Sequence, residues 1–129
     1  MVLAVAAELM GSARVEQLLR GAGQAVGMVE PEPEAVRRAL TGPRTVVVLD
    51  LTVPPAVRDA VFAAAARAGS PVIAFGPHVD GEALAAARRG GAVEVLTRGA
   101  LAHGLVPLVA KHLERLGEAR DGMPERPGT

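Results

Sequence analysis

The feature that most constrains this sequence is a set of five short apolar runs separated by segments of helical periodicity. The runs occupy residues 2–7, 25–29, 45–51, 71–75 and 93–96. The third run contains Val46-Val47-Val48-Leu49 without an intervening polar residue. Such a run is typical of a strand buried on both faces of a parallel sheet.

The segments between the runs carry apolar residues at helical spacing. The first three stripes are Val15, Leu18 and Leu19, then Val36 and Leu40, then Val57, Val61, Phe62 and Ala65. The fourth segment, residues 80–89, is rich in alanine and opens with Asp80, which is suited to cap a helix.

The fifth helix is expected to start close to Pro107, because proline is tolerated in a first turn and disrupts a helix interior. Gly117 is expected to end this helix, and the polar residues after it predict a mobile tail. The predicted organisation is one domain over residues 1–116 and a flexible C-terminal tail over residues 117–129.

The alternation of strand and helix predicts an α/β fold, specifically a flavodoxin-like, doubly wound, five-stranded parallel sheet of order 2-1-3-4-5 with helices on both faces. Functional groups in such folds gather beyond the carboxyl ends of the strands, where the strand order reverses. Asp50 ends the third run there, and Ala6, Ala7 and Glu8 end the first. Sites are therefore expected around Asp50.

Composition excludes several classes of protein. The chain has 129 residues and no cysteine, which excludes disulfides and thiolate metal sites. Basic and acidic residues balance, basic residues are scattered and the aromatic residues are two phenylalanines, so nucleic acid is not expected as a partner. The apolar start lacks a basic leader and meets Glu8 early, so we expect a cytoplasmic protein that does not enter a membrane.

Three segments in this order resemble a known family. Asp50-Leu51-Thr52-Val53-Pro54 resembles the phosphoacceptor segment of CheY-like response-regulator receiver domains, in which a proline follows the aspartate four residues later. Residues 71–75 resemble the fourth strand of that family, and residues 91–98 resemble the fifth strand, which normally ends in lysine. The resemblance extends to Leu116 and implies the same fold.

The resemblance also implies a degenerate site, that of a pseudo-receiver. Receivers transfer a phosphoryl group to an aspartate with the help of magnesium, which needs several oxygen ligands. Asp50 stands at the phosphoacceptor position, but the aligned acidic pair, switch hydroxyl, lysine and following proline are replaced by Ala6 and Ala7, Gly76, Arg98 and Gly99. We hypothesise that Asp50 and Arg98 instead form a standing ion pair that fixes one conformation.

The leading interpretation is a non-catalytic signalling or scaffold module of the two-component type, without a cofactor. No effector domain is expected after the fifth helix, so its output would be binding to another protein or to a second copy. For a homodimer the resemblance implies the face formed by residues 82–116.

Two alternative functions remain open. Asp50 could still accept phosphate, with Glu8 and Asp50 as a weak magnesium site. The chain could also be a small flavodoxin-fold enzyme or ligand-binding domain. Against this last class, Thr52 stands where haloacid dehalogenases need a second aspartate, and residues 8–12 make a poor phosphate loop.

A separate candidate site is the loop after the fourth run. His78 and Asp80 together with Asp50 could bind a metal or act in acid–base chemistry. His103 and His112 have no evident carboxylate partner in the sequence and are interpreted as structural or surface residues.

Overall fold

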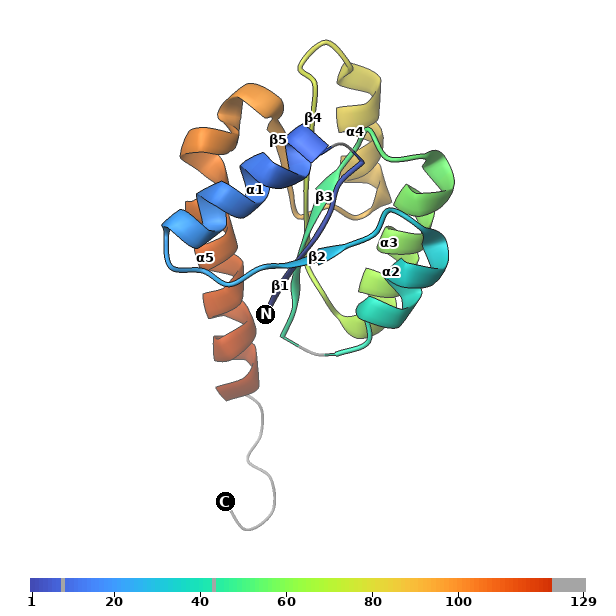
Figure 1. Ribbon diagram of the computed structural model, residues 1–129. Helices are drawn as coiled ribbons and strands as arrows, with labels where there is room; N and C mark the ends of the chain where they lie inside the picture. Colours follow the sequence, from blue (N-terminus) through green and yellow to red (C-terminus); the bar gives the residue numbers. More distant parts are fainter. Residues whose placement is uncertain (8, 43, 122–129) are drawn as a thin grey trace.

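The computed structural model of this chain describes residues 1–7, 9–42 and 44–121. Strands and helices alternate along it (Figure 1). In chain order they are β1 (Val2–Val5), α1 (Leu9–Gly21), β2 (Gly27–Val29), α2 (Pro33–Ala39), β3 (Val46–Asp50), α3 (Pro55–Ala68), β4 (Val72–Gly76), α4 (Gly81–Gly90), β5 (Glu94–Thr97), the 3₁₀ turn η1 (Arg98–Ala100) and α5 (Leu101–Asp121). Each predicted apolar run overlaps one strand, and β4 and β5 each extend one residue beyond their runs.

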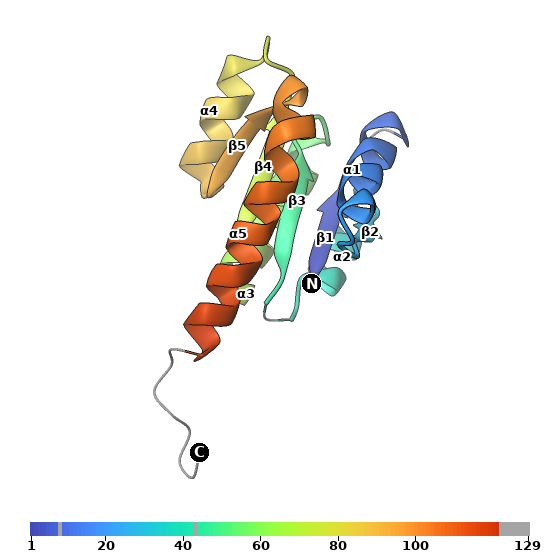
Figure 2. The same cartoon turned by 90° about the vertical axis from the view of Figure 1, so that its left-hand side faces the viewer.

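The strands form one parallel sheet in the order β2-β1-β3-β4-β5, which confirms the predicted fold class and topology. Helices α1 and α5 cover one face, and α2, α3 and α4 cover the other (Figures 1 and 2). The register places Asp50 opposite Phe75 and Gly76 opposite Thr97. The carboxyl ends of β3, β4 and β5 therefore meet at one edge of the sheet.

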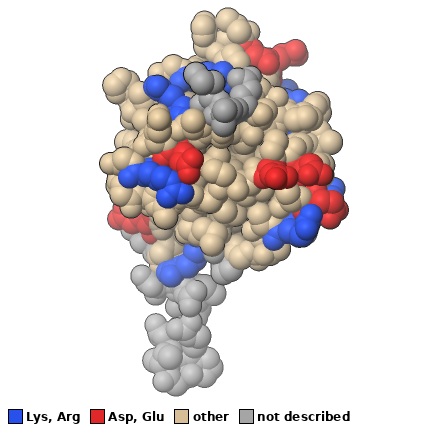
Figure 3. All heavy atoms as spheres, viewed as in Figure 1, with Lys and Arg blue, Asp and Glu red and all other residues tan. Residues whose placement is uncertain are grey.

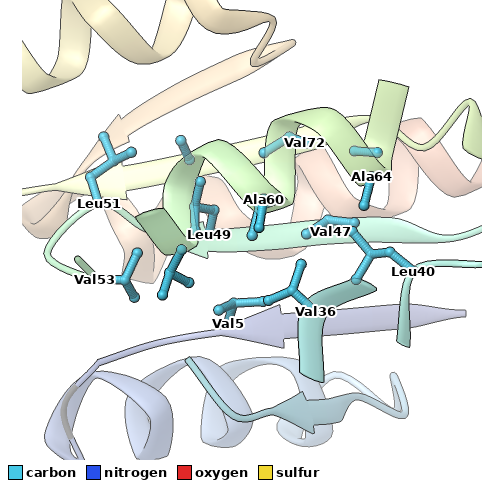
Figure 4. Close-up of a cluster of buried hydrophobic side chains, with 14 of the residues drawn as sticks. Val5, Val36, Leu40, Val47, Leu49, Leu51, Val53, Ala60, Ala64 and Val72 are labelled. Carbon is cyan, nitrogen blue, oxygen red and sulfur yellow. The ribbon is translucent and has the colours of Figure 1, made fainter. Parts of the chain in front are cut away.

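Successive side chains of β3 point to opposite faces of the sheet, so this strand contributes to the core on both faces. Val47 and Leu49 face α2 and α3 in the cluster drawn in Figure 4. Val46 and Val48 face α1 and α5 in a second cluster that also holds Phe75. All four β3 side chains are fully buried. Burial of each contributes about 1.5–3 kcal/mol, which explains why this strand contains no polar residue before Asp50.

Two features end or begin helices as their residue types require. The Asp80 carboxylate accepts a hydrogen bond of 3.1 Å from the Ala83 N–H, so the predicted cap of α4 is confirmed. Gly91 ends the same helix with a φ of 117°, a conformation that residues with a Cβ rarely adopt.

The surface carries charges of both signs. Acidic and basic side chains are interspersed on the face shown in Figure 3. Among the described residues, no helix is both long enough and apolar enough to cross a membrane.

Helix α5 differs from the prediction at both ends. It begins at Leu101, so Pro107 lies in its interior and not in its first turn. It continues through Gly117 to Asp121, so the predicted helix end at Gly117 is wrong. Residues 122–129 of the predicted tail lie outside the described part. Leu101, Leu105 and Val109 are buried at helical spacing on the sheet. This packing outweighs the local cost of the proline.

We expect Pro107→Ala to stabilise the protein. Pro107 is exposed, and its missing N–H leaves the His103 carbonyl without its usual helical donor. Alanine restores that hydrogen bond, and the free energy of unfolding should rise by about 1–3 kcal/mol. Urea unfolding followed by circular dichroism measures the change.

Pro77→Ala is the matched control, because Pro77 lies in the loop between β4 and α4. It should leave stability unchanged or lower it slightly, since proline restricts the unfolded chain. An equal rise in the free energy of unfolding for both variants would show that the missing helical hydrogen bond at Pro107 is not the cause.

Candidate functional site

Asp50 lies at the carboxyl end of β3 with its side chain fully buried, at 0% exposure. The strand alternation that directs Val46 and Val48 toward α1 and α5 directs Asp50 to the same face. A carboxylate in such a position needs hydrogen-bond donors or a cation, because desolvation otherwise disfavours its charged form.

Both carboxylate oxygens of Asp50 accept hydrogen bonds. Thr52 donates to Oδ1 twice, from its backbone N–H at 2.9 Å and from its hydroxyl at 2.7 Å. The Ala7 N–H at the end of β1 donates to Oδ2 at 3.3 Å. The carboxylate thus ties the ends of β1 and β3 to the loop that starts α3.

Thr52 is a site residue that the sequence pattern did not predict. An aspartate that accepts a hydrogen bond from the N–H two residues later forms an Asx turn. The Asp50-Leu51-Thr52 segment after a strand could have indicated this turn. The same segment matches the phosphoacceptor pattern, which assigns no role to Thr52.

The first turn of α1 approaches the same carboxylate. A Cβ built on Gly11 would lie 3.3 Å from Asp50 Oδ2, closer than an ordinary van der Waals contact. Glycine therefore permits this approach. The amino-terminal end of a helix carries partial positive charge, which stabilises an anion beside it.

Arg98 lies beside Asp50 but does not form the bidentate contact that an arginine can make. Its Nη2 is 3.8 Å from Asp50 Oδ1, within ion-pair range but too long for a hydrogen bond. Nε and Nη2 are buried and have no hydrogen-bond acceptor among the described residues. Each such buried donor costs about 1–3 kcal/mol. Attraction to Asp50 offsets part of this cost.

Gly76 lies on the opposite face of the sheet from Asp50. A Cβ there would lie 3.3 Å from the Leu51 Cβ and 3.7 Å from Leu84 Cδ2. The position at which receivers carry a hydroxyl residue is therefore enclosed by apolar side chains.

The described residues do not fit a magnesium ion. Ala6 and Ala7 offer no carboxylate, and Glu8 lies outside the described residues. Within residues 1–7, 9–42 and 44–121, no three His, Cys, Asp or Glu side chains are grouped to hold a metal. His78 and Asp80 are exposed, and Asp80 serves as the α4 cap, so the structure does not bring this pair together with Asp50.

A second polar cluster lies between β5 and α5. Glu94 Oε2 is 2.9 Å from His112 Nε2 and 2.9 Å from Lys111 Nζ. The hydrogen bond with His112, and then that with Lys111, hold the pKa of Glu94 below its usual value. The expectation that His112 has no carboxylate partner is therefore wrong. His103 is exposed.

Sequence could not pair Glu94 with His112, because 18 positions separate them and helix α5 has to pack on β5 first. A Cβ on Gly104 would lie 3.1 Å from Leu96 Cδ2, so glycine allows the close approach of α5 that forms this cluster.

Comparison with known proteins identifies the fold. No protein-family profile and no curated protein matches the sequence. Among solved structures, NtrX from Brucella abortus in complex with ADP aligns with a TM-score of 0.77 at 20% identity over 93% of this chain. This chain spans about a quarter of NtrX, 27% of its length.

Two shorter structures align over nearly their whole length. The signal receiver domain of a protein described as a Luxo repressor from Vibrio parahaemolyticus aligns with a TM-score of 0.76 at 18% identity, over 96% of this chain and 97% of that one. The beryllofluoride-activated NtrC4 receiver domain dimer aligns with a TM-score of 0.70 at 20% identity, over 89% of this chain and 97% of that one. The chain has the CheY-like receiver fold, as the sequence resemblance implies.

We expect Asp50→Ala to lower the free energy of unfolding by about 3 kcal/mol, because three hydrogen bonds and the attraction to Arg98 lose their acceptor in a buried site. Thr52→Val removes one hydroxyl donor and should cost about 1 kcal/mol. Chemical denaturation measures both changes.

The matched control is Asp59→Ala on α3, which removes an exposed carboxylate. Its effect should stay within about 0.5 kcal/mol. If Asp50→Ala lowers the free energy of unfolding no more than this control does, Asp50 does not stabilise the fold.

The lowered pKa of Glu94 predicts acid sensitivity. The usual pKa is 4.5, so the stabilisation is complete above about this value and is lost as the pH falls through the lower pKa of the folded state. Glu94→Gln should lower stability at neutral pH and reduce its dependence on pH below 4.5. Urea titrations at several pH values measure the free energy of unfolding. If it falls with pH below 4.5 as steeply in Glu94→Gln as in the unmodified protein, Glu94 is not the source of the acid sensitivity.

Proposed function

We propose that this chain is a receiver-like signalling module that acts by binding protein and does not carry out phosphoryl transfer. The observation that carries the proposal is the state of Asp50. Its side chain is fully buried, and both of its oxygens accept hydrogen bonds from within the domain. An oxygen that is to attack a phosphoryl group has to reach the donor and be free to form the new bond.

The surrounding residues support the same proposal. Ala6 and Ala7 offer no metal ligand, and Gly76 is packed against Leu51 and Leu84 on the other face of the sheet. The residues that stabilise charge in phosphoryl transfer are thus replaced, while the core of the receiver fold is retained. Asp50 and Arg98 then hold the ends of β3 and β5 in one arrangement.

We expect no covalent phosphorylation of Asp50. Purified protein incubated with acetyl phosphate and magnesium should show an unchanged intact mass, and beryllofluoride should leave the Asp50 and Arg98 amide resonances unshifted. An active receiver domain treated in parallel is the control. A mass increase of one phosphoryl group that Asp50→Asn abolishes would show an atypical response regulator instead.

The proposed binding face comprises α4, β5 and α5, within residues 82–116. β5 is an edge strand of the sheet, and Val93 beside it is 47% exposed. Arg88 and Arg89 at the end of α4 are exposed on the same region, as is Glu114 on α5. Charges of both signs together with an exposed apolar side chain suit a protein partner. The NtrC4 receiver domain, similar in fold, forms a dimer.

We expect the chain to self-associate through this face. Sedimentation velocity over a range of protein concentrations should show a reversible dimer that Val93→Glu weakens. Met28→Glu is the matched control, because Met28 is 39% exposed on β2 at the opposite edge of the sheet. A monomer at all concentrations would exclude the homodimer and leave a different protein as the partner.

A further inference from the structure

A shallow groove of about 370 Å³, the α3–α5 groove, lies between the end of α3 and the second half of α5. Its exposed and half-exposed lining residues are Ala66 and Gly69 at the end of α3, Pro71 before β4, Val93 before β5, and Arg115 and Leu116 of α5. The other lining residues are buried and are not available to a partner. The accessible side chains of the groove are therefore apolar except for one arginine.

The fold brings three more arginines to the same edge of the sheet. In a parallel sheet each connecting helix runs back from the carboxyl edge to the amino edge, so it ends close to the start of the next strand. Arg67 lies in the last turn of α3, shortly before β4, and Arg88 and Arg89 lie in the last turn of α4, shortly before β5. Basic residues that are scattered in the sequence are thus gathered with Arg115 around the amino-terminal ends of β4 and β5.

None of these four arginines has an acidic partner among the described residues. Each is exposed and forms no hydrogen bond or ion pair. Asp59 and Glu82 lie toward the opposite ends of α3 and α4, and Glu94 already has two cationic or hydrogen-bonding partners on α5. Glu114 is the remaining acidic residue of these elements whose side chain the structure describes. The described charge around the groove is therefore mainly positive.

We propose that the α3–α5 groove binds an acidic segment of a partner protein, with apolar side chains of the segment in the groove and its carboxylates on the four arginines. Arginine clusters bind acidic motifs because each guanidinium offers paired N–H donors to a carboxylate. The inference rests on the proposed protein-binding function and deepens it. Val93, Arg88 and Arg89 already belong to the proposed binding face, and the groove extends that face to the end of α3.

The lining of the groove favours a protein segment over nucleic acid. Neither phenylalanine of the chain lines the groove, so it offers no phenyl ring on which a base could stack. Its alanine, proline, valine and leucine side chains suit aliphatic side chains, which nucleic acids lack. The positive charge then selects acidic segments and speeds their association.

The test is an amide NMR titration of the full chain with three pools of short synthetic peptides, at a protein concentration at which sedimentation shows the monomer. The first pool combines Asp and Glu with Leu, Val and Phe. The second replaces the acidic residues by Asn and Gln, and the third replaces the apolar residues by Ser. We expect saturable shifts at Ala66, Gly69, Val93 and Leu116 with the first pool, and at least about fivefold weaker binding of the other two. Sodium chloride should weaken binding of the first pool.

Charge removal at the groove tests the role of the arginines. Arg67→Gln combined with Arg115→Gln should weaken binding of the acidic pool by about fivefold. Arg58→Gln combined with Arg14→Gln is the matched control, because these arginines lie in the first halves of α3 and α1, toward the opposite edge of the sheet. The control should bind like the unmodified protein.

A substitution within the groove tests its location. Ala66→Glu places a negative charge in the groove at an exposed helical position, so the protein should stay folded and lose the binding. Ala63→Glu, at an exposed position of α3 that does not line the groove, is the control and should leave binding unchanged.

Absence of groove shifts with the acidic pool would overturn the proposal, as would equal binding of the neutral pool or of Ala66→Glu. Tighter binding of a single-stranded oligonucleotide at the same residues would identify nucleic acid as the occupant and also overturn it. The outcome is separable from that of the proposed function. Phosphorylation of Asp50 with peptide binding retained would refute only the non-catalytic assignment, whereas a dimer that Val93→Glu weakens, without peptide binding, would refute only the acidic partner.

Discussion

The buried carboxylate of Asp50 joins parts of the chain that have no other polar connection among the described side chains. Oδ2 accepts from the end of β1, Oδ1 accepts from the turn after β3, and Arg98 reaches it from the turn after β5. The Asp50 carboxylate is fully buried and therefore depends on these donors, whereas Thr52 and part of the Arg98 side chain are also exposed to solvent. The carboxyl edge of the sheet is thus organised around one negative charge.

The core of the fold is built independently of the polar side chains at this edge. The core on both faces of the sheet depends on β3. The alternating valines and leucine of this strand pack against helices on each face, and neither core cluster includes Asp50, Thr52 or Arg98. Because Gly11 has no side chain, the first turn of α1 can lie close to Asp50. Because Gly76 has none, Leu51 and Leu84 can pack against the end of β4. The small residues at this edge therefore allow its side chains to pack closely. Arg98 adds a cation whose Nε and Nη2 have no hydrogen-bond acceptor among the described residues.

Helix α5 connects the two polar regions of the molecule. Its start follows Arg98 of η1, and its middle places His112 and Lys111 on Glu94 of β5. Close packing at Gly104 makes this placement possible despite the interior proline.

The sequence by itself determined the five strands, their parallel order and the position of Asp50 at the functional edge, because apolar runs, helical stripes and crossover rules are local or topological. It also predicted the Asp80 cap and the proximity of Arg98 to the edge that holds Asp50. The contact of Thr52 with Asp50 is local, and the sequence could have indicated it. Tertiary structure alone decided that the Ala7 N–H completes the carboxylate site, that Glu94 pairs with His112, and that α5 runs from Leu101 to Asp121. These outcomes depend on distances between elements. Packing of Leu101, Leu105 and Val109 overrides the local preferences of Pro107 and Gly117.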